Sequence, residues 1–424
     1  MEPKKSTFDL SDIIKKEQIC TFFQPIVNLK TGTIFAYEAL VRGLGKDPGK
    51  LITPCELFDQ ADRETCSLEF DRLCRKKALE TFQKHHLPSN AMMFMNINTS
   101  VISNEEEKPH INSITQQMGF APARIGLELI ESPANSAQEL IDFVSHYRNA
   151  GFLIIIDDFG CKQSNLDRLI QIHPDVIKID RSIISCIEND PYRQSILKSI
   201  KSLAEMTGAL CLAEGVETLP EILTCHLLGV DLFQGFAIAF PSPDIEKLEK
   251  ITMLQIKGLQ KELQKGSVEH IRKKRRLTGD INMLADWLIR QIEPKHFDSM
   301  HMLFQEFIAI NNEIECVYLL DSDGYQISET ISSPFVAMQS CPSIFTPAPN
   351  GTNHSLKPFF TCFEALGINR YLTDVYLSLA SGNLCRTFSV KLPPAENCEE
   401  ERTFILCIDF LEEAIRTPTA IKPS

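Results

Sequence analysis

Side chains that could do chemistry first appear in the stretch AYEALVRG, residues 36–43. Because the side chains of an extended strand alternate between its two faces, Glu38, Leu40 and Arg42 would share one face. A carboxylate and a guanidinium on one face can form an ion pair with each other, which is the usual form of buried charge. They can instead bind a cation and an anion. The rest of the chain has to discriminate between these two interpretations.

Similar polar residues recur at the ends of short apolar runs throughout residues 33–240. These runs are rich in β-forming residues and are separated by stretches with helical periodicity. The polar residues at or near their C-terminal ends are Glu38, Asn96, Glu128, Asp157, Asp158, Lys178, Glu214 and Gln234. Burying so many acids beside a single lysine would be prohibitive unless further positive charge lay among them.

The types of these residues indicate which cation that would be. Asn, Asp and Glu oxygens without His or Cys suit Mg²⁺ or Mn²⁺ rather than zinc. The adjacent Asp157 and Asp158 could bridge two ions about 4 Å apart, as in two-metal phosphodiester hydrolysis. Lys178 would then orient or help to deprotonate the attacking water, and Arg42 would clamp a phosphate oxygen. We therefore expect Glu38 to bind metal and Arg42 to bind phosphate.

The elements that must position these residues alternate between strand and helix, which predicts a parallel sheet covered by helices. With this many βα units in about 240 residues, an eight-fold barrel fits better than the alternative of an open sheet. The polar residues would then lie at the C-terminal face, where such barrels carry active sites.

The composition limits the classes of protein and partner. A chain of 424 residues predicts two or three domains, and a net charge of −13 argues against a binder of long nucleic acid. The basic run at 272–276 is a possible nucleic-acid patch, but a solvated helix face is the more common form of such a run. No apolar segment reaches the roughly 20 residues of a membrane span, and no signal peptide is visible, so we expect a cytoplasmic protein. The 14 cysteines include no Cys-x-x-Cys pair and predict neither zinc nor a disulfide framework.

Five motifs, YEALVRG, ELIES, DDFG, VIKID and AEGVET, occur in the order that resembles the EAL-domain family, the cyclic di-GMP phosphodiesterases. The resemblance covers roughly residues 12–245. It implies a TIM-type (β/α)8 barrel with an antiparallel first strand. It also implies opening of cyclic di-GMP to linear pGpG with Mg²⁺ or Mn²⁺, two ions per site.

The same resemblance implies roles for individual residues. The metal ligands would be Glu38, Asn96, Glu128, Asp157, Asp158 and Glu214. Glu38, Asp158 and Glu214 would be catalytic together with Lys178, which would contact the water. Gln24 in FFQPIV, Leu40, Arg42 and Gln234 would hold the ligand or support the site. Asn96 is preferred to Asn98 because the family's asparagine directly ends its strand, and Glu131 of ELIES would anchor the loop after DDFG.

That loop departs from the family pattern. It reads CKQSNL, so Lys162 replaces a glycine and Gln163 an aromatic residue. Because glycine adopts backbone conformations that lysine enters only at a cost, the loop is less able to take an active shape. Two hypotheses follow: a phosphodiesterase of low activity, or a cyclic di-GMP receptor that acts through a protein partner.

The remainder of the chain differs from the barrel. We expect domains at 1–245 (barrel), 246–312 (a helical connector), 313–412 (a smaller α+β unit) and 413–424 (a tail). The connector would dimerise the chain or pack on the barrel, and a homodimer is expected. The α+β unit resembles a PAS or Cache-like sensor, and the layout resembles the YkuI-type EAL proteins. A pocket for a small ligand would lie near Lys357, Phe359, Asp374, Tyr376 and Asp409, although the aromatic residues could serve packing alone.

Overall fold

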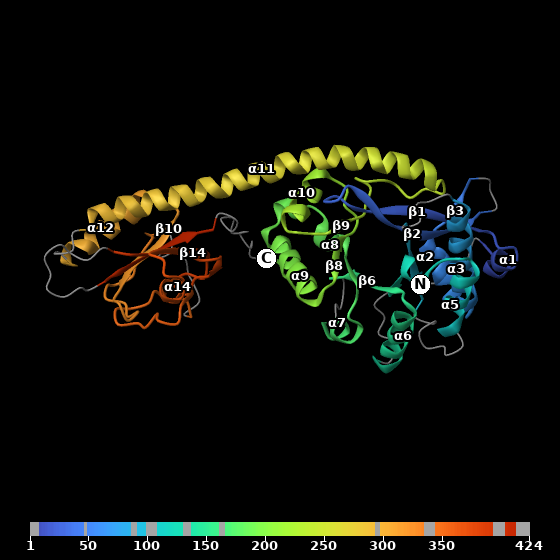
Figure 1. The fold of residues 1–424 in the computed structure, drawn as a ribbon, viewed down its shortest axis with the longest axis horizontal. Helices are drawn as coiled ribbons and strands as arrows, with labels where there is room; N and C mark the ends of the chain where they lie inside the picture. Colours follow the sequence, from blue (N-terminus) through green and yellow to red (C-terminus); the bar gives the residue numbers. More distant parts are fainter. Residues whose placement is uncertain are drawn as a thin grey trace, which may run out of the picture. The chain divides into compact units, whose positions relative to one another are not determined.

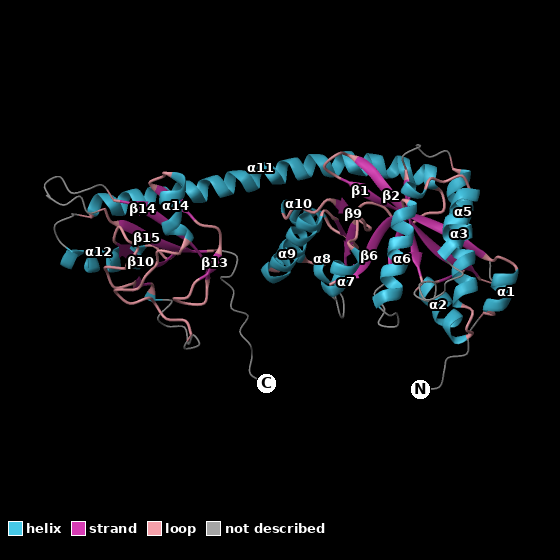
Figure 2. Ribbon diagram, turned by 60° about the horizontal axis from the view of Figure 1, so that its bottom comes forward, coloured by secondary structure: helices cyan, strands magenta, loops and turns pink. Residues whose placement is uncertain are grey.

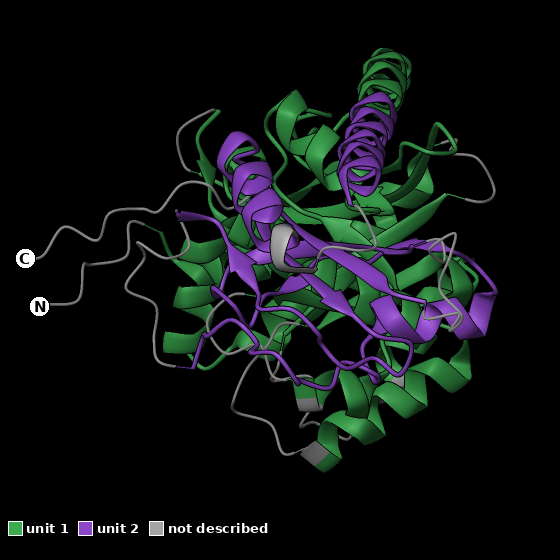
Figure 3. Cartoon of the chain, turned by 90° about the vertical axis from the view of Figure 1, so that its left-hand side faces the viewer, with its two compact units in different colours: residues 1–269 green, residues 270–424 purple. Residues whose placement is uncertain are grey.

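Strands and helices alternate through the first part of the computed structural model, as the sequence pattern predicts (Figure 1). The structure describes residues 8–45, 49–85, 91–98, 108–129, 137–160, 166–292, 297–334, 344–392 and 403–412. The chain divides into two units, residues 1–269 and 270–424, coloured separately in Figure 3. No helix among the described residues combines the length and apolar character needed to cross a membrane.

The first unit is a closed barrel of eight strands, with β3 added at one edge. The barrel strands are β1 (Ile19–Asn28), β2 (Thr33–Leu44), β4 (Met92–Ile97), β5 (Ile125–Leu129), β6 (Leu153–Phe159), β7 (Val176–Ile179), β8 (Leu210–Ala213) and β9 (Leu232–Phe233), and β3 is Leu51–Ile52. Strand β1 pairs antiparallel with both β2 and β9 and so closes the barrel. The strands from β2 through β4 to β9 pair in parallel. The predicted barrel with an antiparallel first strand is confirmed.

Helices cover the outside of these strands (Figure 2). They are α1 (Leu10–Lys15), α2 (Pro54–Arg63), α3 (Ser67–Lys84), α5 (Lys108–Gln117), α6 (Ala137–Ala150), α7 (Leu166–Ile172), α8 (Arg181–Ile184), α9 (Pro191–Thr207) and α10 (Leu219–Leu227), with short 3-10 turns at Pro122–Arg124 and Ile187–Asn189. Two of them begin with a capping box and a proline: Thr53 with Glu56 starts α2, and Thr218 with Glu221 starts α10. These caps satisfy amide groups that the first helical turn leaves without a partner.

An apolar layer fills the barrel interior below the polar residues. It consists of Ile26, Ala36, Phe94, Ile155, Val176, Leu212 and Leu232, all buried. Strand β5 contributes Gly126 at the corresponding position, because a Cβ atom there would come within 2.6 Å of the side chains of Ile155 and Phe94. Since interior side chains recur every second residue, the next interior position on each strand lies one layer nearer the barrel mouth.

The second unit is built on a sheet with strand order β11-β10-β15-β14-β12, with β13 paired to β14. The strands are β10 (Ile314–Leu320), β11 (Ile331–Ser332), β12 (Arg370–Leu372), β13 (Tyr376–Leu377), β14 (Leu384–Lys391) and β15 (Ile405–Leu411). Helix α11 (Ile245–Gln291) spans the boundary between the units, α12 (Phe297–Ile310) follows it, and α14 is Pro358–Leu366. The helical periodicity of 246–310 is thus confirmed within the described residues, which exclude 293–296 with Pro294.

Candidate active site

A ring of polar side chains lies directly above the apolar layer. On the parallel strands each member comes two residues after an interior apolar or glycine position, and on the antiparallel β1 Gln24 comes two residues before Ile26. The members are Gln24, Glu38, Asn96, Glu128, Asp157, Lys178, Glu214 and Gln234, and Asp158 joins them beside Asp157. The barrel therefore brings together residues that are up to 210 positions apart in sequence. The polar strand ends that the sequence singled out form one site.

Lys178 is the electrostatic centre of this ring. Its Nζ atom lies 2.6 Å from Oε1 of Glu214, 2.9 Å from Oε1 of Glu128, 3.1 Å from Oδ1 of Asp157 and 3.7 Å from Oε1 of Glu38. The lysine side chain is 1% exposed. Burial by itself disfavours the charged amine, but the surrounding carboxylates prevail and hold the pKa of Lys178 well above its usual value. The ammonium group therefore stays protonated.

The pKa values of two of the acids are raised as well, which for an acid favours the neutral form. Burial, with the charge of Glu38 adding to it, raises the pKa of Glu128 well above its usual value. Burial also raises the pKa of Glu214 to about 8; Lys178 opposes this increase and Asp157 reinforces it. One ammonium group is insufficient to offset the mutual repulsion of these carboxylates.

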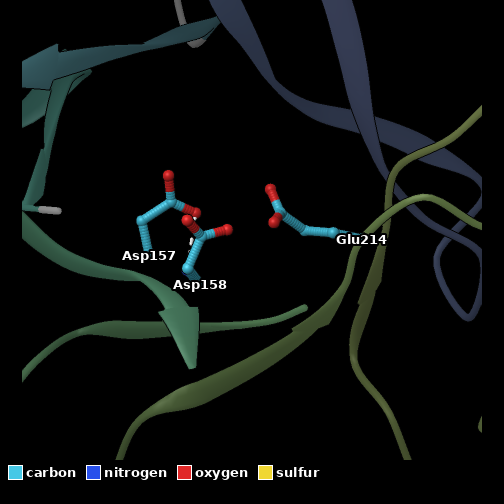
Figure 4. Close-up of side chains that lie close together, drawn as sticks. All are labelled: Asp157, Asp158 and Glu214. Atoms are coloured by element: carbon cyan, nitrogen blue, oxygen red, sulfur yellow. Dashed lines mark hydrogen bonds between the residues drawn. The ribbon is translucent and has the colours of Figure 1, made fainter. Parts of the chain in front are cut away.

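Asp157 and Asp158 reach the site from consecutive positions because strand β6 has an irregularity there. The pairing of β6 with β7 shifts register between Ile156 and Phe159, which inserts one extra residue into β6. Asp158 takes a left-handed conformation with φ of 54°, which Asp tolerates better than most residues, and its amide donates to Oδ1 of Asp157 at 3.0 Å. Figure 4 shows both carboxylates facing Glu214, and one oxygen of each lies within 4.8 Å of the others.

Amide side chains orient Glu38. Asn96 donates from Nδ2 to Oε1 of Glu38 at 3.2 Å, and Gln234 donates from Nε2 to Oε2 of Glu38 and to Oε1 of Gln24. Gln24 in turn donates to the Ala239 carbonyl at 3.1 Å. The structure thus places Asn96 in the ring, Gln234 fixes the Glu38 carboxylate, and Gln24 holds Gln234 in place.

Arg42 does not pair with Glu38. Glu38 forms an ion pair with Lys178 instead. Arg42 donates a hydrogen bond from Nη1 to the Val41 carbonyl, and its guanidinium carbon lies 5.6 Å from the centre of the Phe22 ring. Arg42 and Leu40 are both half-buried. The guanidinium is therefore held near the barrel mouth by an aromatic ring, with donors left for another acceptor.

Three residues of the sequence hypothesis lie outside the described residues: Glu131, Lys162 and Gln163. The anchor and the altered loop after DDFG stay predictions.

Sequence reasoning missed a buried ion pair beside the ring. On α3, Arg75 Nε lies 2.7 Å from Oδ2 of Asp71, and both side chains are at most 3% exposed. Oδ1 of Asp71 accepts a hydrogen bond from the backbone amide of Asn98 at 3.3 Å, just after β4 ends at Ile97. The DRLCR sequence contained the i,i+4 spacing of this pair, but such spacing is usually found on exposed helix faces.

An exposed aromatic pair was also missed. The rings of Phe236 and Phe240 stack with centroids 4.5 Å apart, and the side chains are 50% and 66% exposed. Their segment is tied to the site through Gln234 and Ala239. It also packs tightly on the neighbouring loop, because a Cβ atom at Gly235 would lie 2.1 Å from the Val216 carbonyl oxygen.

The ring fits divalent cations. Glu38, Glu128, Asp157 and Glu214 surround one ammonium group, and Asp158 lies beside Asp157 and Glu214. When fully ionised, the five carboxylates exceed the ammonium group by four negative charges, which two divalent ions would balance. Apart from the ion pair with Lys178, neither Glu128 oxygen has a hydrogen-bond partner among the described residues, and Oε1 of Gln234 also lacks one. Buried oxygens of this kind require a partner, and oxygen ligands suit hard cations.

Known proteins share this architecture. YkuI of Bacillus subtilis, an uncharacterized EAL-domain containing protein, is 24% identical over 387 residues, covering 88% of this chain and 91% of YkuI. Its crystal structure, in complex with c-di-GMP and calcium, matches with a TM-score of 0.71 at 22% identity and covers 96% of this chain and 100% of that chain, a likeness of fold.

A second relative matches just over half of the chain. The probable cyclic di-GMP phosphodiesterase PdeB of Escherichia coli is 28% identical over 240 residues, which cover 55% of this chain and only 45% of PdeB. The family model of the EAL domain matches residues 8–241, which contain every side chain of the ring. The chain belongs to the EAL-domain family.

Proposed function

We propose that the chain is a metal-dependent phosphodiesterase that hydrolyses cyclic di-GMP to linear pGpG. The observation that carries this proposal is the ring of five carboxylates around one protonated lysine at the mouth of the barrel. The family membership and the cyclic di-GMP phosphodiesterases among the relatives support the choice of substrate.

Mg²⁺ or Mn²⁺ would be held by Glu38, Asn96, Glu128, Asp157, Asp158 and Glu214. When bound, such ions polarise a phosphodiester and neutralise its charge.

The protein's own groups would orient the reactants. Lys178 keeps its proton and would direct a water towards the phosphorus atom from the centre of the ring. Arg42 would donate to a non-bridging phosphate oxygen, a geometry that guanidinium suits. Leu40 would contact the ligand on the same face of β2, and the exposed rings of Phe236 and Phe240 would offer a stacking surface to a purine.

Product analysis tests this function. Purified full-length chain is incubated with cyclic di-GMP and either Mg²⁺ or Mn²⁺, and pGpG is measured by chromatography. We expect pGpG from the wild type and none from Glu38→Gln. A matched control is Asp231→Asn, a half-buried carboxylate at the N-terminal end of β9 that pairs with Lys30 and Lys201 and lies outside the ring. Product formation by Glu38→Gln at the wild-type rate would refute the site.

A receptor is the second candidate function, favoured by Lys162 and Gln163 in the loop after Asp157 and Asp158. A loop that displaces Asp158 by about 1 Å would cost on the order of a hundredfold in rate. We therefore propose slow hydrolysis that is better with Mn²⁺ than with Mg²⁺.

The double substitution Lys162→Gly with Gln163→Tyr separates the two functions. We expect faster hydrolysis with little change in nucleotide affinity, since Arg42, Phe236 and Phe240 are not altered. Rapid turnover by the wild type with no gain in the variant contradicts the role of the loop. Binding without pGpG in both forms establishes the receptor.

We further propose that residues 313–412 regulate the barrel and that the chain is a homodimer. Light scattering on the full-length chain measures the oligomeric state, and a monomer would contradict the dimer. Truncation after residue 269, where the first unit ends, should leave cyclic di-GMP binding intact if the second unit only regulates.

A further inference from the structure

The loop 214–218 follows β8 and begins with Glu214, one of the proposed metal ligands. The Glu214 amide donates a hydrogen bond to the Ile179 carbonyl at 3.1 Å, which continues the pairing of β8 with β7. The Val216 amide donates to the Gln234 carbonyl, also at 3.1 Å, just after β9 ends. The amides of the loop thus tie it to both neighbouring strands.

Arg181 holds the carbonyl of the peptide group whose amide is that of Val216. Its Nη1 atom donates to the Gly215 carbonyl, and its Nη2 atom lies 2.7 Å from Oε2 of Glu217. One guanidinium group therefore bridges two residues of the loop, a task that suits its fixed fork of donors. Arg181 lies three residues after Lys178, so one short segment contacts both the Glu214 carboxylate and the backbone that follows it.

The stem of Arg181 also packs on this backbone. Gly215 adopts a left-handed conformation with φ of 65°, and a Cβ atom there would lie 3.0–3.1 Å from Cβ, Cγ and Cδ of Arg181. Glycine is thus needed both for the turn and for the close approach of the arginine. The contact fixes the first half of the loop from the side of β7.

The second half of the loop is fixed by another residue. Glu221 is 3% exposed and accepts hydrogen bonds from the amides of Glu217 at 2.7 Å and Thr218 at 3.0 Å. Its other oxygen accepts the Cys186 amide at 3.0 Å. Loss of Arg181 should therefore leave the start of α10 in place and release the part of the loop next to Glu214.

We propose that Arg181 is a positioning residue that fixes the peptide after Glu214 and so holds the Glu214 carboxylate in place for a divalent cation. The inference rests on the proposed function, because it takes Glu214 as a metal ligand. Glu214 lies among other acids that repel it, so its place depends on such support. Loss of a group that orients a metal ligand typically costs tenfold to a hundredfold, roughly, in metal affinity or activity.

Calorimetric titration of the full-length chain with Mn²⁺, without nucleotide, tests the proposal. We expect Arg181→Ala to bind Mn²⁺ about tenfold more weakly than the wild type, or worse. The matched control is Arg193→Ala. Arg193 also donates to a backbone carbonyl, that of Ser185, and its Nε atom lies 3.2 Å from Oδ2 of Asp190. The two side chains of the control pair are 38% and 41% exposed, against 41% for both Arg181 and Glu217.

Arg193→Ala should bind Mn²⁺ as the wild type does, and thermal unfolding should show similar stability for both variants because both lose an exposed ion pair. Wild-type Mn²⁺ affinity in Arg181→Ala, an equal loss in the control, or a wild type that binds no Mn²⁺ would overturn the proposal. The titration needs no turnover. A wild type that binds Mn²⁺ but forms no pGpG would refute the proposed hydrolysis, and the two variants would still decide the role of Arg181.

A double-mutant cycle with Glu217→Ala tests whether the guanidinium acts through the loop. The double variant should bind Mn²⁺ about as weakly as Arg181→Ala alone, because residues that act as a unit are not additive. Additive losses would contradict the bridge. Where pGpG is formed, Arg181→Ala should lower kcat by about tenfold or more with little change in KM. A higher KM with unchanged kcat would mean that Arg181 binds the nucleotide instead, against the proposal.

Discussion

The Nζ atom of Lys178 lies 2.6 Å from Oε1 of Glu214, and the same ammonium group contacts Glu128 and Asp157. One side chain of β7 thus joins acids from three other parts of the barrel. Removal of this positive charge leaves the buried acids without their ammonium partner, so its effect on the chemistry is measured with metal bound to offset them.

Lys178→Met is therefore expected to lower kcat for cyclic di-GMP by about 10²–10⁴-fold, the contribution typical of a positioned proton-holding group. The matched control is Lys201→Met, which removes another buried lysine that pairs with two carboxylates, Asp231 and Glu205, away from the ring. Turnover is measured at saturating nucleotide and metal. Equal losses in both variants would indicate a general effect on folding instead.

Glu128→Gln should move two quantities in opposite directions. Gln replaces a buried acid whose ionisation is disfavoured by burial and by Glu38, so the metal-free protein should unfold at a higher temperature. Loss of a ligand should weaken Mg²⁺ or Mn²⁺ binding by about tenfold or more. Calorimetry and thermal unfolding measure the two effects, and a fall in both quantities would contradict the role of the residue.

Arg42→Ala should weaken cyclic di-GMP binding by roughly tenfold to a hundredfold, the range for a hydrogen bond to a charged group. Metal affinity should stay unchanged because Arg42 does not pair with Glu38. The exposed Arg63→Ala serves as the control. A similar loss of nucleotide and metal binding would contradict this role and support an ion pair between Arg42 and Glu38.

Asp71→Ala should destabilise the chain by about 3–5 kcal/mol, because it breaks a buried ion pair and removes an acceptor for the Asn98 amide. Asp12→Ala breaks an exposed pair with Lys16 of the same i,i+4 spacing and should cost less than about 1 kcal/mol. Denaturant unfolding compares the two variants. Similar costs would mean that Asp71 does not support the end of β4.

The second unit should lose stability as the pH rises. Asp409 has a pKa of about 7 in the folded chain against 3.8 for the free group, so the folded state binds the proton more tightly. Stability is then fully present below about pH 4 and falls by up to roughly 4 kcal/mol as the pH rises through 7. Asp409→Asn should flatten this dependence, which unfolding of the full-length chain at several pH values would measure. An unchanged slope would show that another group dominates.

The sequence by itself determined much of the barrel. Apolar runs that end in polar residues predicted the alternation of strands and helices, and their order predicted that Glu38, Glu128, Lys178 and Glu214 would meet at one face. This prediction succeeds because side chains alternate between the two faces of a strand, so the sequence of one run is enough to show which of its side chains point inwards.

Only the tertiary structure decided how these side chains pair. Glu38 and Arg42 share a face, yet residues four apart on a strand are about 13 Å apart, so Glu38 pairs with Lys178 instead. Closure of β1 against β9 brings Gln24 to Gln234, and the irregularity in β6 turns Asp158 towards Glu214. The partners come from distant segments, and the local pattern of a single strand does not contain their positions.

The same reason explains the acids of the second unit. Glu315 and Asp409 are unremarkable in sequence, as single polar residues in apolar runs. They come together because β10 and β15 pair antiparallel across some 90 intervening residues: Asp409 pairs with Cys316, and Glu315 precedes Cys316 at the register shift of β10. Strand register depends on the packing of the whole sheet, so only the tertiary structure shows that these two acids lie close together.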